Sequence, residues 1–305
     1  MQRYLFGRFL QTLFSLFVLL TIVFFAARLT GDPVALLAGE IATREQVEKL
    51  RAYYGLDKPM HVQYMLYLSH LARGDLGRSI VTNRRVTTLV VQRLGASLEL
   101  LGAAVLLSLT AGLVTGVYCA VKRGYRFDLL GRIFAVIGQS LPVFWLGLIL
   151  MLVFAVWLRL LPTSGRGGLS HIILPAVTLG CGLSAGILRL TRSSMLDILS
   201  TEYIKLARIK GLSELIVIWK HAVKNALIPV VTYFAVLLAN LVAGAIVTET
   251  VFAWPGFGQL LMQAVIHRDF PLIQGIVLFV GSFVLLANVL VDILYTFLDP
   301  RIRYE

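Results

Sequence analysis

Six long apolar runs dominate this sequence, over residues 9–28, 97–120, 131–158, 172–190, 227–252 and 273–297. The hydrocarbon core of a bilayer is about 30 Å thick, and a helix that crosses it needs about 20 mostly apolar residues. The runs contain isolated Gly and Ser instead of the alternating pattern of a transmembrane strand, which favours helices over a β-barrel. Charged residues make up only 14% of the chain, against about 25% in soluble proteins. We therefore predict an all-α integral membrane protein with six transmembrane helices.

Two of these runs allow more than one interpretation. The run over 131–158 contains Pro142 and is either one long tilted helix or a helix that bends there, because proline removes a backbone hydrogen bond. The first run follows Arg3 and Arg8, as the apolar part of a signal peptide would. Its apolar stretch is longer than the 7–15 residues that are typical of a signal peptide, so we predict a retained helix.

The distribution of basic residues indicates how the chain is oriented in the membrane. The formal net charge is +12, and many Lys and Arg residues gather in segments 121–132 and 189–226. The two short loops on the other side hold only Arg159, Arg166 and Arg268. Short cytoplasmic loops are rich in Lys and Arg, whereas long segments translocate largely regardless of charge. This pattern predicts that both chain ends lie in the cytoplasm, and no aromatic-and-basic stripe indicates nucleic acid.

The long segment after the first run has the sequence signals of two short helices outside the membrane. Thr43 and Gln46 have the spacing of a capping box, Gly55 stands where a helix C-cap would, and Pro59 where a second helix would begin. Gly74 ends the second helix. One face of that helix would present Tyr64, Tyr67, Leu68 and Leu71. The segment is either a cap packed on the transmembrane helices or a docking surface for a soluble partner.

A polar, basic segment, TEYIKLARIKGLSELIVIWKHAVKNALIP, separates the fourth and fifth runs over residues 201–229. It is longer than the 2–8 residues that commonly connect helices. It reads as a helix, a break at Gly211, and a second helix that restarts at Ser213 and Glu214. The second helix carries an apolar stripe, Leu215, Ile216, Ile218, Trp219 and Ala222, with basic residues around it: Lys205, Arg208, Lys210, Lys220 and Lys224. A loop lying on anionic lipid would need only the charge. Two ordered helices with apolar faces instead suit insertion into a groove on another protein.

At these residues the chain resembles a known family. Ala207 and Gly211 match the small residue and the glycine of the cytoplasmic coupling loop of ABC importer permeases, although Lys205 stands at the family's glutamate and Leu206 where a small residue is usual. Further matches follow in order along the chain: YGLDKP (54–59), RGDLGRS (73–79), HAVKNALIPVV (221–231), ETVFAWPGFGQLL (249–261), RDFPLIQG (268–275) and DPRIRY (299–304). Together these segments resemble the dipeptide/oligopeptide/nickel branch of those permeases.

The resemblance implies a type I ABC importer permease fold and a half-channel in the bacterial cytoplasmic (inner) membrane. It implies three kinds of partner: a second, similar permease, two cytoplasmic ATPase subunits that bind ATP and Mg, and an extracytoplasmic substrate-binding protein. The chain itself would bind no cofactor. The implied organisation is a first transmembrane helix over 1–29, an extracytoplasmic helical segment over 30–94, a transmembrane core over 95–298 with its coupling loop over 196–226, and a cytoplasmic tail over 299–305.

Two sets of residues are candidates for function. ATPase coupling is assigned to Lys205, Ala207, Gly211, Leu215, Ile218 and Trp219, with helix packing on Gly211 making the loop rigid. The translocation path or its gate is assigned to Asn240, Glu249, Trp254 and Asn288. Hydrogen bonding between helices is an equal alternative for Asn240 and Glu249, because polar groups in membranes often serve that purpose.

Other function classes leave signatures that this sequence lacks. It contains no phosphate-binding loop and no His-Glu-x-x-His. The five histidines are scattered without the spacing of a metal site, so we predict neither an ATPase nor a metal centre in the chain. An ion- or proton-coupled secondary transporter would show internal repeats with broken helices, and an intramembrane enzyme would show a catalytic constellation. The substrate stays open among dipeptides, oligopeptides, glutathione, and nickel or its chelates.

Overall fold

The computed structural model describes residues 2–29, 31, 34 and 43–298. The regular secondary structure of these residues is helical, and turns and loops connect the helices; an isolated antiparallel β-bridge joins Arg78 and Arg85. The chain divides into two compact units, one formed by Met1–Ser97 with Pro255–Leu286 and the other by Leu98–Trp254 with the chain from Ala287 onward. The first unit thus joins residues of the predicted extracytoplasmic segment to residues 255–286 of the predicted transmembrane core, and the boundary between residues 94 and 95 stays a prediction.

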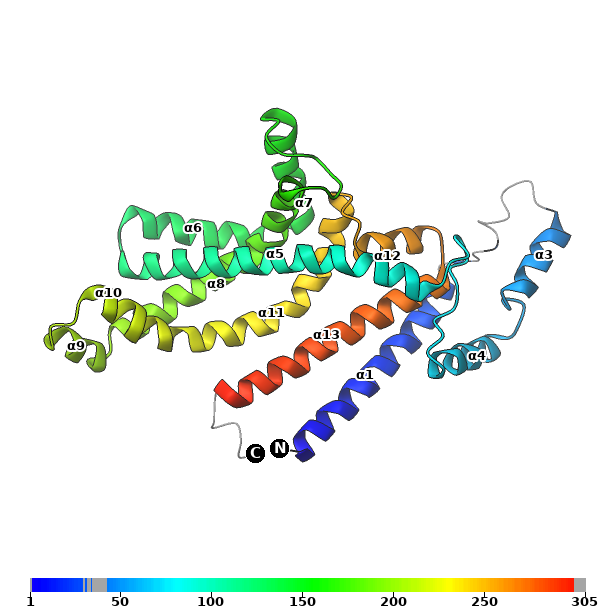
Figure 1. The fold of residues 1–305 in the computed structure, drawn as a ribbon, viewed down its shortest axis with the longest axis horizontal. Helices are drawn as coiled ribbons and strands as arrows, with labels where there is room; N and C mark the ends of the chain where they lie inside the picture. Colours follow the sequence, from blue (N-terminus) through cyan, green and yellow to red (C-terminus); the bar gives the residue numbers. More distant parts are fainter. Residues whose placement is uncertain (1, 30, 32–33, 35–42, 299–305) are drawn as a thin grey trace. The chain divides into compact units, whose positions relative to one another are not determined.

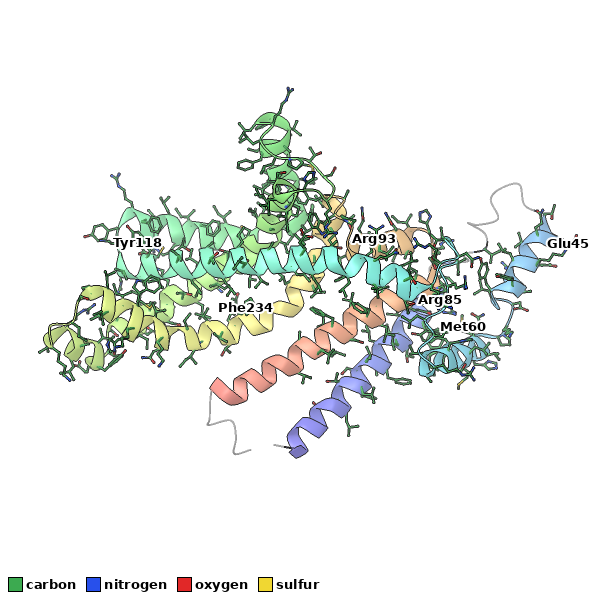
Figure 2. All side chains as sticks on the ribbon, viewed as in Figure 1. Glu45, Met60, Arg85, Arg93, Tyr118 and Phe234 are labelled. Carbon is green, nitrogen blue, oxygen red and sulfur yellow. The ribbon has the colours of Figure 1, made fainter. Side chains whose placement is uncertain are left out.

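The helices follow one another along the chain as coloured in Figure 1. Their bounds are α1 Gln2–Leu29, α3 Arg44–Tyr53, α4 Met60–Ala72, α5 Val86–Val121, α6 Arg126–Ser140, α7 Val143–Leu150, η1 Met151–Trp157, α8 Leu169–Leu199, α9 Glu202–Ile209, α10 Glu214–Ile216, η2 Val217–Val223, α11 Lys224–Val251, α12 Phe257–Ile266 and α13 Phe270–Leu298. The elements η1 and η2 are π-helical. Figure 2 places Glu45 on α3, Met60 at the start of α4, and Arg85 and Arg93 at the start of α5.

Within the described residues, five helices are long and apolar enough to cross a membrane, and a sixth span is obtained when one bent pair counts as a single crossing. That pair is Arg126–Ser140 and Val143–Trp157, and its two parts meet at an angle of 113°. The bend lies at Leu141 and Pro142, so the second of our two interpretations of this run is confirmed. Pro142 lacks the N–H that would continue the helix.

Small residues let helices α5 and α8 pack closely in the second unit. A Cβ placed on Gly112 would lie 2.8 Å from both the Cβ of Ile187 and the backbone oxygen of Ser184. One placed on Gly116 would lie 2.7 Å from the Cβ of Thr191. The two glycines are four residues apart and therefore on one face of α5. Glycines at this spacing allow two helix backbones to approach each other, which favours helix association inside a membrane.

A buried ion pair links α6 to α8 in the same unit. Arg192 donates from Nε to Oδ1 of Asp128 over 2.5 Å and from Nη2 to Oδ2 over 2.9 Å. The backbone N–H of Gly124 donates to the same carboxylate at 3.1 Å. The side chain of Asp128 is 2% exposed and that of Arg192 is 19% exposed. This two-pronged geometry satisfies both oxygens of a carboxylate that would otherwise be costly to bury.

In the first unit, α4 packs on α1. The rings of Tyr64 and Tyr67 lie 5.0 and 5.5 Å from the ring of Phe24. The Tyr64 hydroxyl lies 2.7 Å from that of Thr21. Burial raises the pKa of Tyr67 to about 12. Helix α4 therefore uses its aromatic face as a cap, one of the two alternatives that we considered for this segment.

The capping signals of the outer segment are confirmed. The side chain of Thr43 accepts a hydrogen bond from the backbone of Gln46, and the Gln46 side chain accepts one from the backbone of Thr43. Gly55 and Gly74, which follow the ends of α3 and α4, have positive φ angles of 65° and 74°. Local sequence therefore fixes both ends of α3 and the end of α4. No residue of α3 is buried within this chain.

Two of the quoted family segments, far apart in the sequence, meet in the first unit. The hydroxyl of Ser79 donates to Oδ2 of Asp269 over 2.5 Å, and the backbone N–H of Ile80 donates to Oδ1 over 3.1 Å. Asp269 directly precedes α13, and its carboxylate also accepts from the N–H of Leu272 at 3.4 Å. Asp269 is 1% exposed. One buried carboxylate thus caps α13 and holds the turn before α5.

Candidate functional site

The segment between α8 and α11 folds as a helix, a tight turn and a second helix, as the sequence predicted (Figure 1). Helix α9 ends in a Schellman motif, in which the N–H of Gly211 donates to the oxygen of Arg208 at 2.9 Å and that of Leu212 to the oxygen of Ala207 at 3.4 Å. Gly211 has a φ of 78°. The expected helix packing on Gly211 is wrong, because a Cβ there would meet nothing within 4 Å. The turn needs glycine for its backbone conformation.

The buried faces of α9 and η2 hold this turn on the body of the second unit. Ile204 and Ala207 of α9 are 0% and 7% exposed, and they belong to one apolar cluster with Met195, Val217 and Ala222. The small side chain of Ala207 therefore serves packing inside this chain.

Polar contacts add to this apolar anchorage. The hydroxyl of Tyr203 donates to the backbone oxygen of His221. Arg208 donates from Nε to Oε1 of Glu214 at 2.8 Å, which joins α9 to α10 across the turn. Lys205 pairs with Glu202 over 2.7 Å, although both side chains are largely exposed. The turn is thus held on both of its sides.

The outer face of the same turn is apolar and exposed. We call it the loop face and define it by six residues: Leu206, Ile209, Leu212, Leu215, Ile216 and Trp219. Ile209 is 82% exposed, Leu215 is 70% exposed and Trp219 is 55% exposed. Of the residues expected to make external contacts, Leu215 and Trp219 lie on this face, whereas Ile218 packs against the buried cluster. Sequence reasoning missed Leu206, Ile209 and Leu212, although their place beside Gly211 was a signal.

Of the four residues expected along the translocation path or its gate, the structure describes the side chains of two. Glu249 and Trp254 are buried, at 0% and 1% exposed, and the backbone N–H of Trp254 donates to the oxygen of Glu249 at 2.8 Å. The guanidinium of Arg166 lies 6.0 Å from the centre of the Trp254 ring. The side chains of Asn240 and Asn288 lie outside the described residues. Glu249 and Trp254 thus belong to the interior of this chain near the end of α11.

A cavity of about 350 Å³ lies elsewhere in the second unit, between α6, α7, α8 and α11. Its polar side chains are Gln139, Thr178 and Tyr233. Sequence reasoning did not single out these three residues, which lie far apart in the chain.

Among the residues that the structure describes, no group of three or more His, Cys, Asp or Glu side chains has the arrangement of a metal site. The two cysteines, Cys119 and Cys181, are free.

Comparison with known proteins agrees with this architecture. Residues 112–304 match the family described as "Binding-protein-dependent transport system inner membrane component", and residues 1–101 match its N-terminal companion family. The chain belongs to this family of inner-membrane permeases. It is a multi-pass ABC transporter permease subunit, a transport protein without an ATPase domain.

The relatives and solved structures make the likeness more specific. The chain is 40% identical over 306 residues, covering all of both chains, to the glutathione transport system permease protein GsiC of Salmonella typhimurium. It is also 40% identical to the di/tripeptide transport system permease protein DppB of Pseudomonas aeruginosa, over 90% of each chain. The inward-facing MetNI methionine ABC transporter matches 70% of this chain and 97% of its own with a TM-score of 0.58 at 20% identity. That last likeness shows the fold alone.

Proposed function

We propose that this chain forms half of the path through which an ATP-driven importer moves short peptides, glutathione among them, into the cytoplasm. The relatives named for glutathione and di/tripeptide transport match the chain over nearly its whole length, which favours peptides over nickel or its chelates. The other half of the path is a sibling permease, and an extracytoplasmic binding protein delivers the substrate. An ion-coupled transporter or an intramembrane enzyme would not belong to this family.

The loop face is the observation that supports ATPase coupling best. An element that transmits a push between two conformations must be rigid and must present a surface to its partner. Here the Schellman turn at Gly211 and the Arg208–Glu214 pair fix the shape, and the buried Ile204 and Ala207 anchor it. Leu215 and Trp219 stay exposed on the other side. In the complex this face would lie in a groove of an ATPase subunit.

The coupling role can be tested by comparing two glycines, Gly211 and Gly124, that both have a positive φ but lie in different turns. Gly211→Val forces a β-branched residue into a positive φ, which costs about 1–3 kcal/mol, and should abolish binding-protein-stimulated ATP hydrolysis in the reconstituted complex. Gly124→Val imposes the same strain, because Gly124 has a φ of 83° and open space around it, but it lies in the α5–α6 turn. It should leave coupling intact. Equal losses in both variants would mean that general strain, and not the loop face, is responsible.

Lipid binding is the alternative role for this loop, and lysine removal distinguishes it. A loop held on anionic lipid would lose about 1 kcal/mol of membrane affinity for each Lys removed. An exposed charge contributes little to a packed contact, so Lys205→Ala should leave stimulated ATP hydrolysis close to that of the wild type. The coupling role would be overturned if Lys205→Ala lost stimulated ATP hydrolysis while Gly211→Val retained the wild-type rate.

Orientation and assembly are tested separately. We propose that both chain ends face the cytoplasm, so a cysteine introduced at Glu48 should react with an impermeant reagent added outside, and one at Ser213 should not. Reaction of both from the same side would contradict this topology. We also propose a hetero-pair, and a transport-competent complex that contains two copies of this chain and no sibling permease would refute it.

A further inference from the structure

The cavity between α6, α7, α8 and α11 has the size and composition of a site for a small uncharged group. Its volume of about 350 Å³ falls at the lower end of the ~300–1,000 Å³ that is typical of small-molecule sites. Its lining residues come from four helices of one unit: Gly138, Gln139, Leu141, Val143, Leu146, Thr178, Leu179, Gly182, Leu183, Tyr233, Leu241 and Gly244. No ionisable carboxylate, lysine, arginine or histidine is among these lining residues.

Two polar lining side chains from different helices converge beside Gly186, which lies one turn of α8 beyond the lining residue Gly182 and is not itself a lining residue. The hydroxyl of Tyr233, on α11, and Nε2 of Gln139, at the end of α6, both approach Gly186 of α8. A Cβ built on Gly186 would lie 2.5 Å from that hydroxyl and 2.9 Å from that nitrogen. Gly186 therefore leaves the space in which an amide and a phenol from separate helices come together. Figure 2 labels Phe234, the residue that follows Tyr233 on α11.

A third lining residue carries a polar group that has no hydrogen-bond partner among the residues that the structure describes. Thr178 is 1% exposed, and its Oγ1 makes no hydrogen bond within the part of the chain that the structure describes. A buried hydroxyl without a partner costs about 1–3 kcal/mol. Threonines in transmembrane helices commonly donate to a carbonyl of the preceding turn, as Thr110 does to Leu106 at 2.7 Å. Thr178 lines the cavity, but its Oγ1 is itself buried, so a group in the cavity would reach this hydroxyl only after the side chain changes its rotamer.

The bend at Pro142 lies against this cavity. Leu141 and Val143, on the two sides of the 113° bend, both line it. A straight helix through these positions would present other side chains to α8 and α11. Gly138, Gly182 and Gly244 also line the cavity and bring backbone without side chains to its surface. The bend and these glycines therefore leave the space of the cavity, and a few hydrogen-bonding side chains line it.

We propose that this cavity is the place where the chain contacts the peptide bond of a substrate in transit. The proposal rests on the peptide-transport function proposed above. A peptide bond is uncharged and offers one donor and one acceptor, which an amide, a phenol and a hydroxyl can satisfy. A transport path must bind its cargo well enough to admit it and weakly enough to release it. Neutral hydrogen bonds meet that need, because each contributes only about 0.5–1.5 kcal/mol.

The experiment uses the assembled importer in proteoliposomes. The binding protein is added outside and is saturated with the substrate under test. Uptake is measured for a dipeptide and for the matching depsipeptide, in which an ester replaces the peptide bond, after the binding protein is shown to bind both. Gln139→Ala and Tyr233→Phe should each lower the rate of dipeptide uptake about 3- to 10-fold, the effect of one lost neutral hydrogen bond. The wild type should prefer the dipeptide, and the Gln139→Ala variant should lose that preference.

Matched controls carry the same substitutions outside the cavity. Tyr118→Phe changes an exposed tyrosine of α5 that Figure 2 labels, and Gln263→Ala changes an exposed glutamine of α12. Both should transport like the wild type. Thr178→Val keeps the shape of the side chain and removes the unpartnered hydroxyl, so it should assemble normally and still transport less well. Assembly of every variant is checked by co-purification with the ATPase subunits.

The possible outcomes separate the two proposals. If all cavity variants transport both substrates as the wild type does, the cavity does not contact the peptide bond. If loaded binding protein stimulates ATP hydrolysis in the wild type but no peptide enters, the proposed substrate class is wrong. If stimulation itself is absent in the wild type, the proposed ATPase coupling fails independently of the cavity.

Discussion

Removing the charge of Asp128 should destabilise the second unit strongly, because it would leave Arg192 without its partner. The two side chains are joined by hydrogen bonds of 2.5 and 2.9 Å and are 2% and 19% exposed. Breaking one partner of a buried pair costs about 3–5 kcal/mol. Arg192 retains some access to its surroundings, so the lower value applies. We expect Asp128→Asn to cost ~3 kcal/mol.

This cost translates into a measurable shift of the unfolding midpoint. For a unit of roughly 150–250 residues, a loss of ~3 kcal/mol lowers the Tm by roughly 6–12 °C. Thermal unfolding of the purified complex can be followed by tryptophan fluorescence, under the same detergent and lipid conditions for every variant. The double variant Asp128→Asn with Arg192→Gln should be more stable than the sum of the single variants predicts, because neither charge is then left alone.

A second pair in the same unit provides a matched control. Arg166 and Glu99 form an ion pair over 2.5 Å, but their side chains are 44% and 41% exposed. Exposed pairs contribute about 0–1 kcal/mol, so Glu99→Gln should change the Tm by only ~0–4 °C. The reasoning from burial is refuted if Asp128→Asn and Glu99→Gln lower the Tm equally, or if the double-variant cycle shows no coupling.

Three further changes have expected outcomes. Gly112→Leu should cost about 1–3 kcal/mol, or prevent assembly, because the added side chain meets Ile187 and the backbone of α8; thermal unfolding of the complex measures it. Ala253→Gly should raise stability by up to about 1 kcal/mol, since Ala253 has a φ of 46° in the left-handed region; an unchanged or lower Tm would contradict this. The folded-state pKa of Tyr67, about 12, lies above its ordinary value of 10.0. The wild type therefore keeps the full contribution of the neutral phenol below pH ~10 and loses it as the pH rises towards ~12. Tyr67→Phe should unfold with less pH dependence over that interval, and identical pH profiles would count against the role of burial.

Local signals in the sequence predicted the parts of this fold that depend on neighbouring residues. The pairing of Thr43 with Gln46 and the break at Gly211 follow from backbone groups a few positions away, so the residue types alone define them. Apolar run length predicted the spanning helices for the same reason. The bend at Pro142 was one of two alternatives, because proline is also tolerated inside long helices, as Pro175 is within α8.

Contacts between distant segments could not be predicted in this way. Asp128 and Arg192 are 64 residues apart, and nothing near either residue identifies the other. The cavity could not be predicted for the same reason. In the sequence, Gln139, Thr178 and Tyr233 each look like an ordinary polar residue in an apolar helix. Their meeting depends on how three helices pack. The loop face was found in part, because exposure of Leu215 and Trp219 follows from the local helical stripe, whereas the inward turn of Ile218 depends on the cluster below it.

The bond between Ser79 and Asp269 has a consequence for the order in which the chain can be completed during synthesis. The two residues are 190 positions apart, yet both belong to the first unit. At roughly 5–20 residues per second, a ribosome makes the second residue ~10–40 s after the first. Throughout that interval the backbone N–H of Ile80 lacks the carboxylate that later accepts its hydrogen bond. The unit that starts first is therefore finished only after the whole of the second unit's continuous segment has been made.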